Sequence, residues 1–148
     1  MKIFVDSSII LAFLAVQDER AYKIIEEVEN HIATGYINAI IVDEVIHGYL
    51  RLTTRLSSKR IRRLLAKKDK RLIELIKNDI EPVLELFITL PITIEPQEVI
   101  DVIKEYGLMP ADSIIALTCK HQGVNTIATL DSDFERIPWL KIITSPSL

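Results

Sequence analysis

The sequence predicts an α/β protein in which helices cover both faces of a parallel central sheet, a three-layer α/β/α sandwich. Three observations lead to this class. Short apolar runs alternate with longer amphipathic segments along the chain, as in successive β-α units. The 148 residues match the size of one domain, so a single domain is expected over 1–148. Hydrophobic residues make up 49% and charged residues 26%, which favours a folded globular chain over a disordered one.

The first third of the chain is expected to hold two strands and three helices. KIFV is a short apolar run ended by Asp6, and GYINAIIV is a second apolar run that begins at Gly35, which ends the helix before it. Glu44 is expected to begin the helix after this second strand. The expected strands span 2–5 and 35–42, and the expected helices span 7–16, 18–33 and 43–52.

The remaining chain continues the alternation. From Ser57 to Phe87 the spacing of apolar residues stays helical, and Pro82 is expected to divide this stretch into two helices. A proline within ITLPITIEP favours an edge strand there. The other expected elements are strands at 88–96, 124–130 and 140–145 and helices at 96–107 and 110–123.

Four acids fall near the carboxyl ends of the predicted strands or in the first turns of the following helices: Asp6, Glu44, Asp112 and Asp131. In an open parallel sheet the functional crevice lies at that edge. Taken singly, each acid has an ordinary structural explanation, since aspartates are common in turns and helix N-termini stabilise acidic side chains. The combination of four at one edge favours a functional site.

A cluster of carboxylates favours a particular chemistry. Like charges brought close together raise one another's pKa and resist joint ionisation, so such a cluster needs a cation. Oxygen ligands select hard ions such as Mg²⁺ or Mn²⁺. Such ions promote cleavage of phosphate esters by activating water and neutralising the phosphate.

The chain resembles the PIN-domain ribonucleases, and in particular the VapC-type toxins of toxin–antitoxin pairs. Four segments carry the resemblance in order: FVDSSIIL, IIVDEVIHGYLR, ADSIIALTCKHQG and TIATLDSDF. The resemblance implies that Asp6, Glu44, Asp112 and Asp131 form the catalytic metal site, with Ser8 and Thr129 as supporting hydroxyls. Asp43 and Asp133 stand beside two of these acids and are alternatives that supplement or replace them.

The resemblance also implies a reaction, a metal cofactor and binding partners for this site. It implies an endoribonuclease that depends on Mg²⁺ or Mn²⁺, cleaves RNA to leave a 5′-phosphate, forms a homodimer and is neutralised by a small antitoxin protein. The alternative is a catalytically silent PIN-like module that binds RNA or a protein.

A basic segment departs from the compact toxins and is expected as a helical insertion at about 55–87. Of the 18 Lys and Arg residues, 11 lie between Arg51 and Lys77. Two interpretations stay open, a surface that follows the RNA backbone or a helix with solvated charges. The candidates for RNA contact are Arg60, Arg62, Arg63 and Lys67.

The location of the protein is expected to be cytoplasmic. The apolar run at 9–16 is shorter than the roughly 20 residues that span a bilayer, and no signal-peptide pattern is found, so no membrane association is expected. The single cysteine, Cys119, is compatible with a reducing compartment.

Overall fold

A five-stranded parallel sheet forms the centre of the protein, in a computed structural model that describes residues 1–15 and 17–144. The strand order is β3-β2-β1-β4-β5, and every neighbouring pair is parallel. Val16, at the end of the first expected helix, and the end of the last expected strand at 145 lie outside the described residues. The strands are β1 Lys2–Val5, β2 Thr34–Ile37, β3 Ile88–Thr89, β4 Thr126–Ala128 and β5 Lys141–Ile143.

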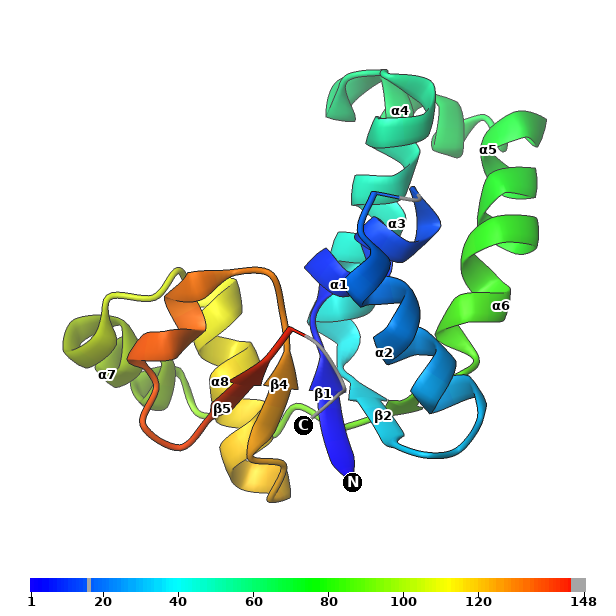
Figure 1. Ribbon diagram of the computed structural model, residues 1–148. Coiled ribbons are helices and arrows are strands. Elements are labelled where there is room, and N and C mark those ends of the chain that lie inside the picture. The colour runs from blue at the N-terminus through cyan, green and yellow to red at the C-terminus, as the bar shows by residue number, and fades with distance from the viewer. Residues whose placement is uncertain (16, 145–148) are drawn as a thin grey trace.

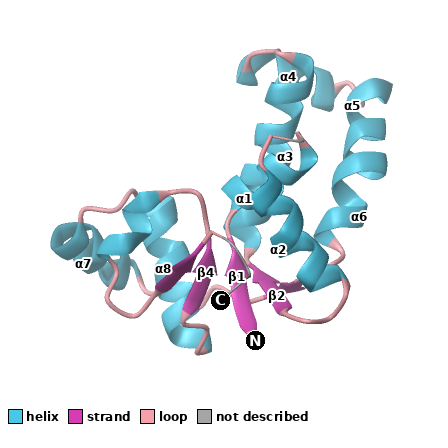
Figure 2. Cartoon of the chain, viewed as in Figure 1, coloured by secondary structure: helices cyan, strands magenta, loops and turns pink. Residues whose placement is uncertain are grey.

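Helices lie on both sides of the strands, which confirms the predicted sandwich (Figures 1 and 2). The connections from β1 to β2 and from β3 to β4 run in opposite directions along the sheet, so right-handed crossovers place their helices on opposite faces. The helices are α1 Ser7–Leu14, α2 Glu19–Glu29, α3 Ala39–Thr54, α4 Ser58–Ala66, α5 Lys70–Leu75, α6 Glu81–Leu84, α7 Pro96–Tyr106 and α8 Pro110–Gln122, with a π-helical turn η1 at Ile76–Ile80 and a 3-10 turn η2 at Ser132–Arg136.

The core explains the apolar character of the strands. Phe4 and Val5 of β1 and Ile127 of β4 are fully buried, because these central strands are covered on both faces. The chain leaves β1 toward β2 but later returns to β4 on the other side of β1. The winding order therefore reverses between β1 and β4, and their carboxyl ends border the crevice in which parallel sheets bind ligands.

The second strand is shorter than expected because its apolar run changes structure halfway. Asn38 is the N-cap of α3, and its Oδ1 accepts a hydrogen bond of 3.2 Å from the Ile41 amide. Its Nδ2 donates to Thr118 of α8 at 3.0 Å. Glu44 therefore lies in the second turn of α3 instead of beginning that helix.

Residues 55–87 form an arm of α4, α5, η1 and α6 that packs beside α3 and extends away from the sheet (Figure 1). The arm breaks at 67–69, where Lys68 has a φ of 55° and Asp69 caps α5 through a 3.1 Å bond from the Leu72 amide. The expected division at Pro82 is wrong. Pro82 lies in the first turn of α6, directly after η1, where the i→i+5 spacing of the π turn accommodates a residue without an N–H.

The expected edge strand at 88–96 is reduced to two residues, Ile88 and Thr89, because the chain after them pairs only through the Leu90 amide to the Ile37 carbonyl. Within residues 1–15 and 17–144, no helix has the length and apolar character needed to cross a membrane.

Candidate active site

Asp6 lies at the carboxyl end of β1 and is the most buried of the predicted acids, with 5% of its surface exposed. Its Oδ2 accepts hydrogen bonds from Ser8 Oγ at 2.8 Å and Thr129 Oγ1 at 2.7 Å. These are the two hydroxyls that the family resemblance implied as supports. They fix the orientation of the Asp6 carboxylate across the junction between β1 and β4.

The segment after β4 carries two more acids on a short chain of hydrogen bonds. The Asp131 amide donates to Thr129 Oγ1 at 2.9 Å, and the Asp133 amide donates to Asp131 Oδ1 at 2.9 Å. Asp131 is thus the N-cap of η2 as well as a candidate ligand. Two residues, Thr129 and Leu130, separate it from the end of β4, because this strand stops at Ala128.

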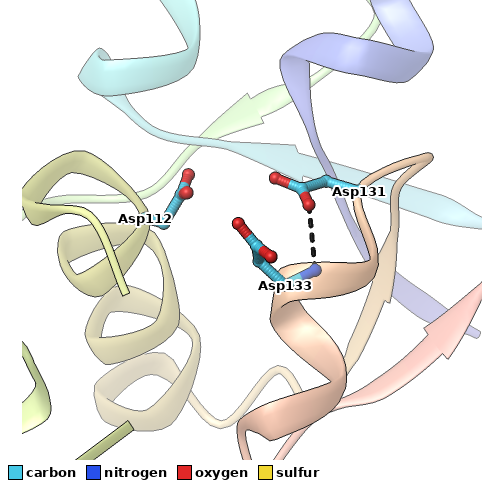
Figure 3. Close-up of side chains that lie close together, drawn as sticks. All are labelled: Asp112, Asp131 and Asp133. Carbon is cyan, nitrogen blue, oxygen red and sulfur yellow. Dashed lines mark hydrogen bonds between the residues drawn. The ribbon is translucent and has the colours of Figure 1, made fainter. Parts of the chain in front are cut away.

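Asp112 joins these two acids from the opposite side. Pro110 occupies the first position of α8, so Asp112 lies in the first turn and points toward η2 (Figure 3). Asp112, Asp131 and Asp133 each offer a carboxylate oxygen within 4.8 Å of the others. Asp133, which the sequence offered as an alternative to Asp131, therefore lies in the same group as Asp131.

Glu44 borders the same space from α3. Its Oε1 is buried, and no hydrogen-bond partner for it is found among the described residues. Burial, followed by the negative charges of Asp6 and Asp112, raises the pKa of Glu44 to about 7. A buried carboxylate oxygen without a donor is costly unless a proton or a cation satisfies it.

The acids influence one another electrostatically. Burial, with contributions from Asp6, Asp131 and Asp133, raises the pKa of Asp112 to about 6. Burial also raises the pKa of Asp6, although the hydrogen bonds from Thr129 and Ser8 oppose this shift. The site thus concentrates negative charge in a partly dehydrated crevice. The buried Glu44 oxygen and the grouped aspartate oxygens fit a hard divalent cation.

Arg136 is a residue of this region that the sequence did not single out. Its guanidinium pairs with Asp133 Oδ1 at 3.0 Å and donates to the Gly107 carbonyl at 3.4 Å. It therefore joins η2 to the end of α7 and holds one oxygen of Asp133. The i, i+3 spacing of Asp133 and Arg136 is the feature of the sequence that could have indicated this ion pair.

The other candidate residues lie outside the acidic group. Asp43 is exposed on α3 and lines a pocket between α3 and α4, although its charge contributes to the raised pKa of Glu44. The four candidate RNA contacts are all exposed on the arm: Arg60, Arg62, Arg63 and Lys67.

Comparison with known proteins places this geometry in a family. The model of the PIN domain matches residues 3–140. The chain belongs to the PIN-domain family. It is 37% identical to the ribonuclease VapC2 of Methanocaldococcus jannaschii, in an alignment that covers 96% of this chain and 93% of that relative.

Solved structures agree on the fold. A chain of VapBC2 from Rickettsia felis, crystallised with a DNA fragment from their promoter, aligns with a TM-score of 0.58 and 18% identity over 97% of this chain and 98% of that chain. A chain of FitAcB from Neisseria gonorrhoeae aligns with a TM-score of 0.58 and 25% identity over 95% of this chain and 96% of that chain. The PIN-domain arrangement therefore extends over nearly the full length of this protein.

Proposed function

We propose that this chain is a metal-dependent endoribonuclease and the toxin of a toxin–antitoxin pair. The observation that carries the proposal is the group of three aspartate carboxylates at the switch point of a PIN-domain sheet. The charges of Asp6 and Glu44 border this group, and one buried Glu44 oxygen has no partner among the described residues. The similarity to a ribonuclease VapC2 supports RNA as the substrate.

Each acid has a distinct part in this proposal. Asp112, Asp131 and Asp133 offer the grouped oxygens that would hold Mg²⁺ or Mn²⁺, and Glu44 offers its buried Oε1 from α3. Asp6 contributes a charge whose orientation is fixed by Ser8 and Thr129. A bound divalent cation supplies a water of lowered pKa and neutralises the phosphate that is attacked. Hydrolysis is expected to leave a 5′-phosphate.

The proposed partners follow from the family resemblance and from the similar solved structures. The similarity to a chain of a VapBC2 complex supports a small antitoxin protein as the partner. A homodimer is also expected, and light scattering of the purified protein measures it. Arg60, Arg62, Arg63 and Lys67 are proposed to contact the RNA, because exposed cations on one arm attract it by displacing counterions from its phosphates.

The deciding experiment uses a labelled mixed-sequence RNA with Mn²⁺, with Mg²⁺ and with EDTA. Wild type is expected to give discrete fragments with either metal and none in EDTA, and Asp6→Asn to give none. Asp101→Asn is the matched control, since Asp101 is an exposed aspartate of α7 outside the acidic group, and its carboxylate accepts a hydrogen bond from Gln97. Binding of RNA without cleavage in every condition would instead favour a silent module.

A further inference from the structure

A pocket of about 460 Å³ lies between α3 and α4, outside the acidic group. Its floor is aliphatic and is made by Ile46 and Leu50 of α3 and by Ile61 and Leu65 of α4. Leu50 and Ile61 are buried, whereas Ile46 and Leu65 are partly exposed. A volume in the range of roughly 300–1,000 Å³ with an apolar floor is typical of a site for a small organic group.

The rim of the pocket is polar and carries both signs of charge. Asp43 and His47 line it from α3, and Ser58 and Arg62 line it from α4. His47 Nε2 and Ser58 Oγ lie 2.9 Å apart in a hydrogen bond that joins the two helices. Within residues 1–15 and 17–144 the side chains of Asp43 and Arg62 have no ion pair or hydrogen bond. Both are therefore available to a ligand.

The position of the pocket connects it to the acidic site. Asp43 directly precedes Glu44, and the residues of α3 that line the pocket occupy one helical face at positions 43, 46, 47 and 50. From Glu44 to Leu50 the helix axis advances about 9 Å. A nucleic-acid strand with its phosphate at the acids would bring a neighbouring nucleotide over this face.

We infer that this pocket binds an unpaired guanine base of the RNA, an inference that rests on the proposed function. Guanine presents O6 and N7 as paired acceptors, which an arginine such as Arg62 contacts through two hydrogen bonds. Its N1–H and N2–H₂ are donors on the other edge, and the Asp43 carboxylate accepts from such donors. The aliphatic floor contacts the flat ring.

The same two residues disfavour the other bases. Adenine places its N6–H₂ donor where guanine has O6, so it would direct a donor at a guanidinium that can only donate. Cytosine and uracil are smaller and would fill less of the floor. The charged rim and the basic surface of α4 also favour a nucleic-acid occupant over an apolar protein segment.

The test measures binding without cleavage, by fluorescence anisotropy in EDTA. The probes are labelled uridine dodecamers in which one central position is U, A, C or G. Wild type is expected to bind the guanine probe about 5- to 100-fold more tightly than the all-uridine probe. Arg62→Gln is expected to lower this ratio to near one.

Two further variants separate base recognition from charge. Arg63→Gln removes the same charge from the same helix outside the pocket lining, so it should weaken binding to every probe and leave the guanine ratio unchanged. Asp43→Asn removes a negative charge, so it should bind the all-uridine probe at least as tightly as wild type while its guanine ratio falls. Opposite changes of affinity and preference in one variant are not expected of a misfolded protein.

The outcomes also separate this inference from the proposed function. Equal binding of the four probes by wild type, or a guanine ratio that survives Arg62→Gln and Asp43→Asn, would overturn the inference and leave the pocket to a protein partner. Cleavage of RNA with Mn²⁺ but without guanine preference would support the proposed nuclease and contradict the base site. Guanine preference without any cleavage would support the base site and contradict the proposed nuclease. Absence of RNA binding in EDTA together with absence of cleavage in Mn²⁺ and in Mg²⁺ would overturn both.

Discussion

The acidic edge of the sheet and the basic arm hold their charges in different ways. Asp6 is buried and oriented by two hydroxyls, and Asp112 is placed by the first turn of a helix. The arm presents Arg60, Arg63 and Lys67 to solvent. The apolar cluster that joins the outer part of the arm to α3 is small, with Leu50 of α3 and Ile61 and Leu72 of the arm as its buried residues in the described chain.

This difference separates two tasks. Fixed, partly dehydrated carboxylates act at one defined position, because small displacements change the geometry of a bound cation. Solvated cations attract phosphate over a wider surface and need no single geometry. We therefore expect changes at the acidic edge to abolish turnover and changes on the arm to alter affinity in a salt-dependent way.

The largest effect is expected from Asp112→Asn. This variant removes a charge from the grouped oxygens while it keeps the size of the side chain, and loss of several kcal/mol of charge stabilisation lowers the cleavage rate by about 1,000-fold. Single-turnover cleavage with Mn²⁺ measures it. Asp101→Asn on α7 is expected to match wild type. Cleavage by Asp112→Asn within tenfold of wild type would remove Asp112 from the site.

A smaller effect is expected from Thr129→Val, which keeps the shape of the side chain but removes the hydroxyl that donates to Asp6. Groups that orient ligands typically contribute about 10- to 100-fold in metal affinity. Mn²⁺ titration by calorimetry or electron paramagnetic resonance measures the change. Thr129→Ser retains the donor and should recover most of the affinity. If the valine and serine variants bind Mn²⁺ equally, the hydroxyl has no orienting role.

Substitutions on the arm test the role of its exposed cations. Replacing Arg60, Arg63 and Lys67 with glutamine should lower RNA affinity roughly tenfold and reduce the slope of log affinity against log salt by about 2, since each single-strand phosphate contact contributes about 0.7. Mn²⁺ affinity should not change. Glutamines at Lys2, Lys23 and Lys104 remove equal charge outside the arm. An equal loss of slope in both triple variants would mean that the arm is not a dedicated RNA surface.

Much of the acidic edge was predictable from local rules. Pro110 and Gly123 mark the ends of α8, so the place of Asp112 in its first turn follows from the sequence. Asp6 directly follows an apolar strand, and parallel strands bring their carboxyl ends to one edge. The sequence favoured Asp131 and kept Asp133 as a possible ligand, because the convergence of the two acids depends on the 3-10 turn that follows β4.

Other features depend on tertiary packing. An apolar run such as INAIIV suits a buried strand and a buried helix equally, and the Asn38 bonds to Ile41 and Thr118 decide for a helix. The Tyr49 hydroxyl donates to Asp79 of η1 at 2.7 Å and joins the arm to α3. A contact across 30 residues leaves no periodic signal, so the π turn and the tolerance of Pro82 could not be predicted.

The smallest effect is expected in the pH dependence of stability without divalent cations. Burial and neighbouring charges raise the pKa of Glu44 from 4.5 to about 7 and that of Asp112 from 3.8 to about 6. Between the ordinary and raised values, the folded protein keeps protons that the unfolded chain has released. Stability therefore falls as pH rises from about 4 to about 7, and it is constant with respect to these groups above that range.

Thermal unfolding in EDTA measures this dependence, and both groups are half-buried, so solvent screening limits the change to a few degrees. Glu44→Gln should flatten the decline, whereas Glu26→Gln, at an exposed position of α2, should follow wild type. Mn²⁺ should raise the melting temperature more at pH 8 than at pH 5, because a cation competes with protons for the same oxygens. A Mn²⁺ effect independent of pH would show that the ion binds elsewhere.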